Sequence, residues 1–177
     1  RSACLYEVAG VSAALDFVRI ALAGMLLAAS ERCVKLMDTP WSGLPVGLQV
    51  PGSPDLGLSI LAITAESLAT EVSALAQPVS HIVTSTSGAE GIEDRASNLP
   101  LSARRLAEQV DAGEAIIAIE LLVSAQAVDM RDVTPLGRGT ARAYEQVRKV
   151  VPTLRLGETP PVDVTPVVEI VRAGVII

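Results

Sequence analysis

The sequence predicts an all-α protein in which long helices form a bundle. Half of its 177 residues are hydrophobic, and apolar residues recur at steps of three and four over several long segments. That spacing is the period of an α-helix. Only 2% of the residues are aromatic, and no run alternates apolar and polar residues as a half-buried strand does. With 19% charged residues, the chain is also too apolar to be disordered.

The first helix is expected over residues 8–38. Its apolar stripe would run for about 45 Å at a rise of 1.5 Å per residue. Phe17, Ile20 and Leu27 lie off that stripe, so more than one face of the helix should be covered. A helix covered on several faces is typical of a bundle. The stripe consists of Val8, Val11, Leu15, Val18, Leu22, Met25, Ala29, Cys33 and Leu36.

The remaining elements follow from breakers and periodicity, and together they form a single helical unit over residues 1–177. Pro40 should end the first helix, and residues 39–57, with four prolines and four glycines, should form an irregular loop without a regular element. A second loop over 77–91 is rich in Ser and Thr, and a polar loop of this length is more often functional than structural. Further helices are expected over residues 58–76, 93–132, 140–151 and 167–173.

Charge and hydropathy exclude several functions. The net charge of −6 offers no basic face for nucleic acid. The charge-free stretch Ile20–Ser30 has eleven residues, against about 20 needed to span a bilayer, and no signal-peptide pattern opens the chain. Cys4 and Cys33 form neither a disulfide framework nor a zinc site. We therefore expect a cytoplasmic chain, without a membrane span, whose apolar helices are buried against partner subunits.

Generic motifs add little. No dinucleotide-binding, phosphate-binding or metal-binding pattern occurs, and no metal site is expected. His81 is the single histidine, and a lone histidine in a loop more often has a structural role than a catalytic one. The acidic pair that begins at Glu93 either caps the next helix or points one carboxylate into a site as a base or substrate anchor. Glu120, alone among apolar residues, is expected to be buried and paired with an arginine.

Five short motifs, in order, resemble the C-terminal third of the aromatic amino acid ammonia-lyases, the family of the histidine and phenylalanine enzymes. They are Ser42-Gly43-Leu44-Pro45, Leu75-Ala76-Gln77-Pro78, Thr84-Ser85, Glu93-Asp94 and Ala103-Arg104-Arg105-Leu106, and Ala14–Phe17 and Ser30–Arg32 extend the match upstream. The resemblance spans residues 6–151 and implies the C-terminal part of the helical ammonia-lyase fold.

The resemblance also implies a cofactor and a partner. Family enzymes eliminate ammonia from an α-amino acid through an electrophilic methylidene-imidazolone (MIO) ring, which forms from an internal Ala-Ser-Gly. This chain contains no Ala-Ser-Gly, and Thr86-Ser87-Gly88 falls at the wrong place in the family order. Either the MIO forms on a larger partner chain, or this chain is a fragment of a longer enzyme. The low charge and the excess of apolar helix favour a partner chain, in a hetero-oligomer with a tetramer-like core. The resemblance fits this, because family members are helical homotetramers whose sites draw on three subunits.

Four site residues are carried over from the family. Glu93 is expected to contact the substrate amino group or assist proton transfer, and Tyr6 to lie against the MIO ring. Gln77 and Ser85 match residues that shape the substrate site. The pattern departs from the family at Leu5-Tyr6-Glu7, where the family has Asn-Phe-His, and beside Glu93, where Ile92 and Arg95 replace Gln and His. A buried tyrosine with a bonded hydroxyl is the other interpretation of Tyr6.

The leading hypothesis is thus the smaller component of an MIO-type ammonia-lyase or aminomutase that acts on an aromatic or histidine-like amino acid. A second hypothesis is a non-catalytic helical scaffold that kept the family architecture and mediates assembly alone. A third is a self-sufficient enzyme that uses His81 with Glu93.

Overall fold

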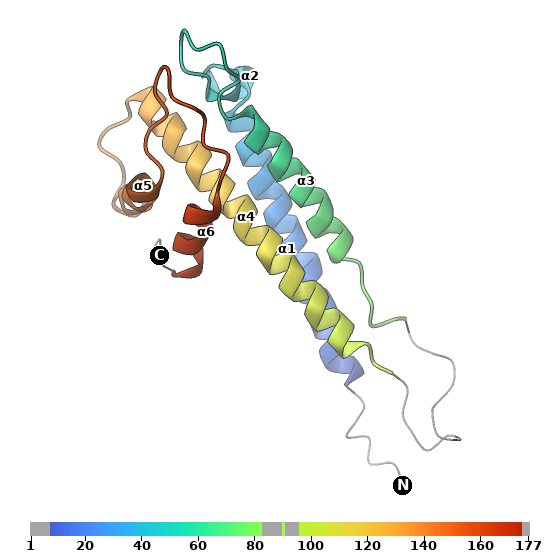
Figure 1. Ribbon diagram of the computed structural model, residues 1–177. Helices are drawn as coiled ribbons and strands as arrows, with labels where there is room; N and C mark the ends of the chain where they lie inside the picture. Colours follow the sequence, from blue (N-terminus) through green and yellow to red (C-terminus); the bar gives the residue numbers. More distant parts are fainter. Residues whose placement is uncertain (1–7, 83–89, 91–95, 175–177) are drawn as a thin grey trace.

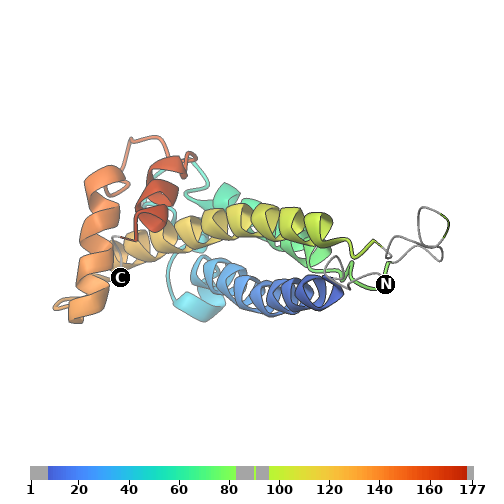
Figure 2. The same cartoon turned by 90° about the horizontal axis from the view of Figure 1, so that it is seen from below.

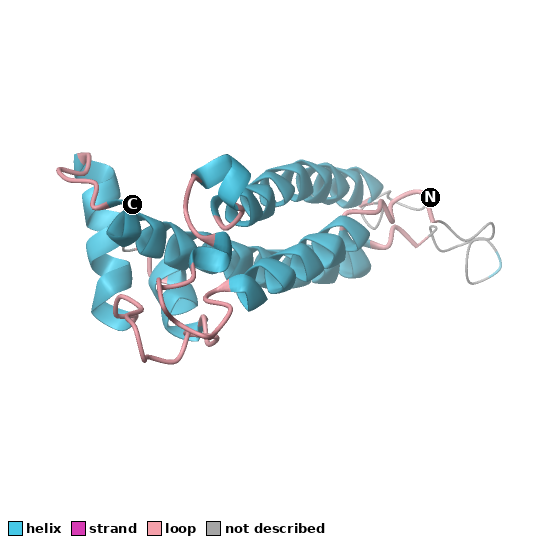
Figure 3. Ribbon diagram, turned by 90° about the horizontal axis from the view of Figure 1, so that it is seen from above, coloured by secondary structure: helices cyan, strands magenta, loops and turns pink. Residues whose placement is uncertain are grey.

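The computed structural model describes residues 8–82, 90 and 96–174, and within these ranges every regular element is helical (Figure 3). This confirms the all-α prediction. The elements are α1 (Ala9–Leu36), α2 (Thr39–Ser42), the 3₁₀ turn η1 (Val46–Leu48), α3 (Ser59–Leu75), α4 (Leu99–Arg131), α5 (Arg138–Val150) and α6 (Thr165–Arg172).

Three long helices, α1, α3 and α4, run side by side and form the elongated body of the molecule (Figure 1). The short α6 packs beside α4, and α5 lies crosswise near the end of α4 that is farther from its start (Figure 2). The bundle therefore has two distinct ends. One holds the start of α1, the end of α3 and the start of α4, and the other holds α2 and α5.

Two element boundaries differ from the prediction. The fourth helix begins at Leu99 rather than at residue 93, because Asn98 takes a left-handed conformation (φ 56°) and Pro100 occupies the first turn. The connection over 39–57 is not wholly irregular, since it contains α2 and η1. Pro40 lies in the first turn of α2, and α1 has already ended at Leu36.

The predicted apolar stripe of α1 coincides with its buried face only near the end of the helix, at Ala29 and Cys33. Val11, Val18 and Met25, all members of the stripe, are about half exposed or more. The buried residues of α1 are Ser12, Asp16, Arg19, Ala23, Leu26, Ala29, Ser30 and Cys33. In α4 the apolar period predicts a stripe of Ala103, Leu106, Val110, Ile117, Leu121, Ser124 and Val128, and none of these residues is fully buried. The buried face of α4 instead includes Ser102, Gln109 and Gln126. Both helices place polar side chains inside the bundle.

The apolar core is concentrated toward the α2 and α5 end. The larger cluster there joins α1, α3, α4, α5 and α6 around fully buried residues that include Leu48, Leu58, Leu61, Ile119, Leu122, Val147 and Val167. Cys33 belongs to this cluster as a free thiol, and burial together with the nearby Glu120 carboxylate raises its pKa to about 12. A smaller cluster lies farther along the bundle and consists of Ala23, Leu26, Ala29, Ala69, Val72, Ala112 and Ile116.

Beyond the smaller cluster, toward the start of α1, the core is polar. The Asp16 carboxylate, 3% exposed, pairs with the Arg19 guanidinium one turn later in α1. It also accepts a hydrogen bond from the Ser102 hydroxyl of α4 (3.0 Å) and from the backbone N–H groups of Val79 (2.9 Å) and Ser80 (2.8 Å). Four donors from three segments thus converge on one carboxylate.

Arg19 and Gln109 extend this polar core to α3. The Arg19 guanidinium donates to the carbonyl oxygens of Leu75 and Gln77, where α3 ends. The Gln109 amide nitrogen donates to the carbonyls of Arg19 and Val72, at 3.0 Å each. These hydrogen bonds join α1, α3 and α4 through polar groups, in addition to the apolar contacts of the smaller cluster. We call Asp16, Arg19, Ser102 and Gln109 the polar core.

The polar core sets the protonation state of Asp16. Burial alone raises the pKa of a carboxyl group, but hydrogen bonds from Ser80, Arg19 and Ser102 outweigh it, so the pKa of Asp16 lies well below its usual range. Asp16 therefore stays ionised throughout the neutral pH range.

A large part of α1 faces outward with no charge on it. Between Gly10 and Ala28 the only charged residues are Asp16 and Arg19, and both are buried. The exposed apolar face of α1 comprises Val11, Phe17, Val18, Ile20, Met25 and Leu27, of which Phe17 is 76% exposed. Among the described helices, α1 alone is long and apolar enough to cross a membrane, a property that core helices of soluble proteins and signal sequences share. Of its most apolar window, 28% is buried.

Two glycines close the connection between α1 and α3. Gly47 (φ 64°) and Gly57 (φ 57°) are left-handed, and the Leu58 N–H donates to the Gly47 carbonyl at 2.7 Å. A Cβ on Gly57 would lie 2.5 Å from the Gly47 carbonyl oxygen and 2.8 Å from the Gln49 nitrogen. No side chain fits between these two backbone segments.

We predict that Gly57→Ala lowers the free energy of unfolding by more than about 2 kcal/mol, because it adds both a left-handed alanine and a backbone clash. Denaturant unfolding at a fixed protein concentration measures the change. Gly139→Ala is the control, since its Cβ meets nothing within 4 Å. It should leave stability unchanged or raise it by up to about 1 kcal/mol. Equal effects of the two variants would contradict the close approach.

We further predict that Asp16→Asn destabilises the protein by about 3–5 kcal/mol at neutral pH, because it leaves Arg19 as an uncompensated buried cation. Since the pKa of Asp16 is lowered on folding, its contribution is complete above the unfolded value of 3.8 and declines as the pH falls below it. Unfolding of the two proteins compared from pH 8 to pH 3 tests this. A difference that stayed constant down to pH 3 would contradict it.

The control for the pH series is Asp111→Asn. The Asp111 carboxylate pairs with Arg172 on the surface, where both side chains are well exposed. Such a pair contributes less than about 1 kcal/mol, so this variant should change stability only slightly at neutral pH.

Candidate functional site

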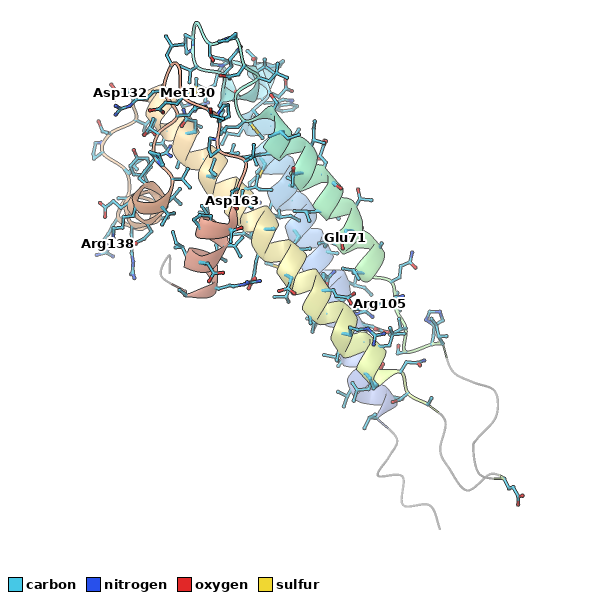
Figure 4. All side chains as sticks on the ribbon, in the orientation of Figure 1. Glu71, Arg105, Met130, Asp132, Arg138 and Asp163 are labelled. Atoms are coloured by element: carbon cyan, nitrogen blue, oxygen red, sulfur yellow. The ribbon has the colours of Figure 1, made fainter. Side chains whose placement is uncertain are left out.

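The candidate site lies at the end of the bundle where α3 ends and α4 begins. Between them, the described part of the connection starts with residues 77–82, which include Gln77 and His81. Arg105, from the second turn of α4, lies beside this segment (Figure 4). Met130 and Asp132 mark the opposite end of the same helix. The start of α1 lies at the site end as well.

The backbone of residues 77–82 is held by side chains from two helices. The Gln77 carbonyl accepts from Arg19 (3.1 Å) and from Arg105 (3.3 Å). The Asp16 carboxylate accepts from the backbone N–H groups of Val79 and Ser80. On the other side, the Asn98 amide donates to the carbonyls of Val79 (3.3 Å) and Ile82. The two ends of the α3–α4 connection are therefore bound to one another and to α1.

The side chains of this segment divide into an inner and an outer set. Val79 is fully buried, whereas Gln77, Pro78, His81 and Ile82 are exposed. The backbone is fixed while the Gln77 amide group is presented at the surface. The segment can thus offer hydrogen-bonding groups to a ligand or to another chain without moving itself.

Of the four site residues predicted from the sequence, the structure describes only Gln77. Tyr6, Ser85 and Glu93 lie outside the described residues, and so does Thr86-Ser87-Gly88. Their roles remain predictions. Glu90, the one described residue of the intervening segment, is exposed.

Sequence reasoning missed the residues that hold the segment, namely Asp16, Arg19, Asn98 and Ser102. The signal for the first two was present, since opposite charges at positions i and i+3 inside an otherwise apolar stretch can pair on one face of a helix. Ser102 lies one residue before the stripe expected for α4.

The residues of this chain do not fit formation of the MIO group. That ring forms from Ala-Ser-Gly, and the sequence contains none. Among the described residues, no three His, Cys, Asp or Glu side chains come together as metal ligands. The described part of the site therefore supplies hydrogen-bond donors and acceptors rather than an electrophile.

Glu120 is paired with an arginine, as the sequence predicted, although it is only partly buried. Its two carboxylate oxygens accept from Nε and Nη2 of Arg32, the latter at 3.0 Å, so the pair is bidentate. Glu120 also borders two hollows toward the α2 and α5 end. One, of about 360 Å³, lies between α4 and α5 with a mainly apolar lining, and the other, of about 410 Å³, lies beside Trp41.

A second carboxylate, that of the partly buried Asp129, helps to hold α5 at the α2 and α5 end of the bundle. The Asp129 carboxylate accepts from the hydroxyl of Tyr144, the guanidinium of Arg148 (2.7 Å) and the hydroxyl of Thr153 (2.7 Å). Like Asp16, it gathers donors from several segments. It lies away from residues 77–82, and its bonds join α4 to α5 and to the chain after α5.

Comparison with known proteins places these features in a family. Residues 2–149 match the family model for aromatic amino acid lyases. The chain is 32% identical to histidine ammonia-lyase from Stigmatella aurantiaca over 164 residues, which cover 93% of this chain and 32% of that protein. It is 36% identical to the histidine ammonia-lyase of Natranaerobius thermophilus over 141 residues, 79% of this chain and 27% of the relative.

Solved structures agree with the sequence matches. Histidine ammonia-lyase from Trypanosoma cruzi superposes with a TM-score of 0.85 at 29% identity, over 93% of this chain and 32% of that one. Tyrosine aminomutase from Streptomyces globisporus gives 0.84 at 27% identity, over 96% of this chain and 32% of the other. This chain spans about a third of the length of these relatives, and it belongs to the aromatic amino acid lyase family.

Proposed function

We propose that this chain is the smaller component of an ammonia-lyase or aminomutase that acts on an aromatic or histidine-like amino acid. The electrophilic MIO group would be supplied by a larger partner chain that carries Ala-Ser-Gly. One observation carries the proposal: residues 2–149 match the aromatic amino acid lyase family, and 93–96% of the chain aligns with histidine ammonia-lyase and tyrosine aminomutase.

Each candidate residue has a role in this proposal. Abstraction of a weakly acidic β-proton, with loss of a poor leaving group, needs an electron sink, and that is the chemistry the partner's MIO group would supply. Glu93 would contact the substrate amino group or move a proton there. Tyr6 would lie against the partner's MIO ring, and Gln77 and Ser85 would shape the substrate site.

The fixed backbone of residues 77–82 supports this assignment for Gln77. Its amide group is exposed on a segment whose carbonyls and N–H groups are already bonded to Asp16, Arg19, Asn98 and Arg105. A binding group that is held in place before the substrate arrives loses little conformational freedom on binding.

The exposed apolar face of α1 supports a partner subunit. It extends for about 27 Å from Gly10 to Ala28, and no charged side chain interrupts it. Monomeric proteins rarely leave so long an apolar surface in water. We propose that helices of other subunits cover it in a hetero-oligomer with a tetramer-like core in the cytoplasm, rather than lipid.

The second candidate function is a non-catalytic assembly subunit of the same family. Departures from the family pattern favour it, namely Tyr6 between Leu5 and Glu7, and Ile92 and Arg95 around Glu93. Such a subunit would need the exposed apolar face of α1 but not the carboxylate of Glu93.

We predict that Glu93→Gln lowers kcat/KM of the assembled enzyme more than tenfold, equivalent to about 1.4 kcal/mol of barrier, because the carboxylate contacts the substrate amine. Tyr6→Phe should also lower it. Ammonia release from L-histidine, L-phenylalanine and L-tyrosine is measured after co-expression with an Ala-Ser-Gly-bearing partner.

Glu90→Gln is the matched control for Glu93→Gln, since Glu90 is an exposed carboxylate three residues earlier, and it should leave the rate unchanged. Unchanged activity in Glu93→Gln and Tyr6→Phe would favour the assembly subunit. The absence of a stable complex and of lyase activity, or ammonia release by this chain alone, would contradict the proposal.

We also predict that Phe17→Asp prevents assembly, because a carboxylate in a subunit interface would lose its hydration without a partner. Native mass of the complex purified from its own cells, or after co-expression, gives the readout. Wild type should travel with a companion about twice its size, and the variant should not.

Val162→Asp is the control, since Val162 is 65% exposed in the connection before α6, and it should leave the mass unchanged. A wild-type monomer, or a Phe17→Asp chain that assembles normally, would show that the α1 face is not the interface.

A further inference from the structure

The polar core is an unusual way to join three helices. Desolvating a carboxylate and a guanidinium is costly, and apolar side chains of similar size often stabilise a fold as well. Yet Arg19 is fully buried and Asp16 nearly so, while the same bundle has two apolar clusters elsewhere. The ionic pair is therefore better explained by what it binds than by its contribution to packing.

What the pair binds is irregular backbone. After α3 ends, the N–H groups of Val79 and Ser80 have no helical carbonyl to reach, and a buried unpaired N–H is costly. The Asp16 carboxylate accepts both, at 2.9 and 2.8 Å. Arg19 binds the carbonyls of Leu75 and Gln77 on the same stretch. The Asp16 carboxylate thus binds two backbone N–H groups and the Arg19 guanidinium binds two backbone carbonyls, so the pair holds four backbone groups in total.

The geometry fixes one position for Gln77 in particular. Its carbonyl is shared by Arg19 and Arg105, which approach from α1 and α4. Its side chain is left exposed. The Gln77 N–H also donates to the carbonyl of Ala74 in α3 (3.3 Å). The backbone of Gln77 is thus held from α1, α3 and α4 at once.

We propose that Asp16 and Arg19 are positioning residues, which hold the backbone of residues 77–80 so that the Gln77 side chain stands ready at the substrate site. They act through backbone hydrogen bonds and do not touch substrate. This inference rests on the proposed function for its kinetic consequence, but the holding of the segment is independent of the reaction.

The test compares Asp16→Asn and the double variant Asp16→Asn/Arg19→Gln with wild type, in the assembly as it is purified. The double variant removes both charges and keeps two amides, so no unpaired buried cation prevents folding. Asp129→Asn is the control, because it weakens a comparable set of hydrogen bonds to a carboxylate at the other end of the bundle.

Amide hydrogen exchange gives the first readout. In the double variant, the Val79 and Ser80 amides should exchange at least tenfold faster than in wild type, while amides in the middle of α3, such as those of Ala65 and Ala69, should not change. Asp129→Asn should leave Val79 and Ser80 unchanged. Unaltered exchange at these two amides would overturn the proposal, whether or not the assembly is a lyase.

Kinetics give the second readout, with L-histidine and L-phenylalanine as substrates. The double variant should raise KM at least fivefold with a smaller change in kcat, and Gln77→Ala should do the same. If Asp16 and Arg19 act through Gln77, adding Gln77→Ala to the double variant should cause little further rise. If the rises in KM caused by the double variant and by Gln77→Ala multiply when the variants are combined, the positioning role is overturned. An equal rise in KM in Asp129→Asn would overturn it as well.

The two proposals fail in different ways. A wild-type assembly that neither releases ammonia from L-histidine, L-phenylalanine or L-tyrosine nor converts any of them to its β-amino acid would remove the proposed function. Faster exchange at Val79 and Ser80 in that same assembly would still show that the buried pair holds the segment.

Discussion

A single buried carboxylate, that of Asp16, connects everything at the site end of this molecule. It lies on α1, binds the hydroxyl of Ser102 on α4, and accepts the backbone N–H groups that follow α3. Arg19 balances its charge and reaches the carbonyls on the same stretch. These bonds link the three long helices to one another and to the connection after α3. The network is not fully paired, since among the described residues Arg19 Nε and Gln109 Oε1 are buried without a hydrogen-bond partner.

The sequence was sufficient for the fold class and for the family, and it failed on which side of α1 and α4 is buried. Periodicity depends on apolar residues, and in α1 these occur on every face, so Val18 and Met25 were placed inside although they are exposed. The inward positions are partly taken by Asp16, Arg19 and Gln109, which a hydrophobicity pattern assigns to solvent. The start of α4 was also placed wrongly, because α4 begins only after Asn98, whose backbone is left-handed. The pairing of Glu120 with an arginine could be anticipated, because a lone carboxylate in an apolar helix needs a partner.

The site could be predicted only in part, for a related reason. Motifs identify residues such as Gln77, Ser85 and Glu93 by their likeness to a family, but they do not say what holds them. Gln77 is fixed through its carbonyl by Arg19 and Arg105, which lie 58 and 28 positions away in the chain. Such long-range bonds to backbone atoms leave no spacing rule in the sequence. Polar contacts matter at both ends of the bundle. At the far end the Asp129 bonds to Arg148 and Thr153 add to apolar packing, whereas buried charges and hydrogen bonds hold the segment that bears Gln77.

The uncharged outer face of α1 has a consequence for how such a protein is produced. In the proposed assembly that face is covered only when the larger chain is present. Copies made in excess would expose a long strip of hydrocarbon to water and adhere to one another or to other cellular surfaces. Synthesis of the two polypeptides would then have to keep pace, and orphaned copies would be targets for chaperones and proteases.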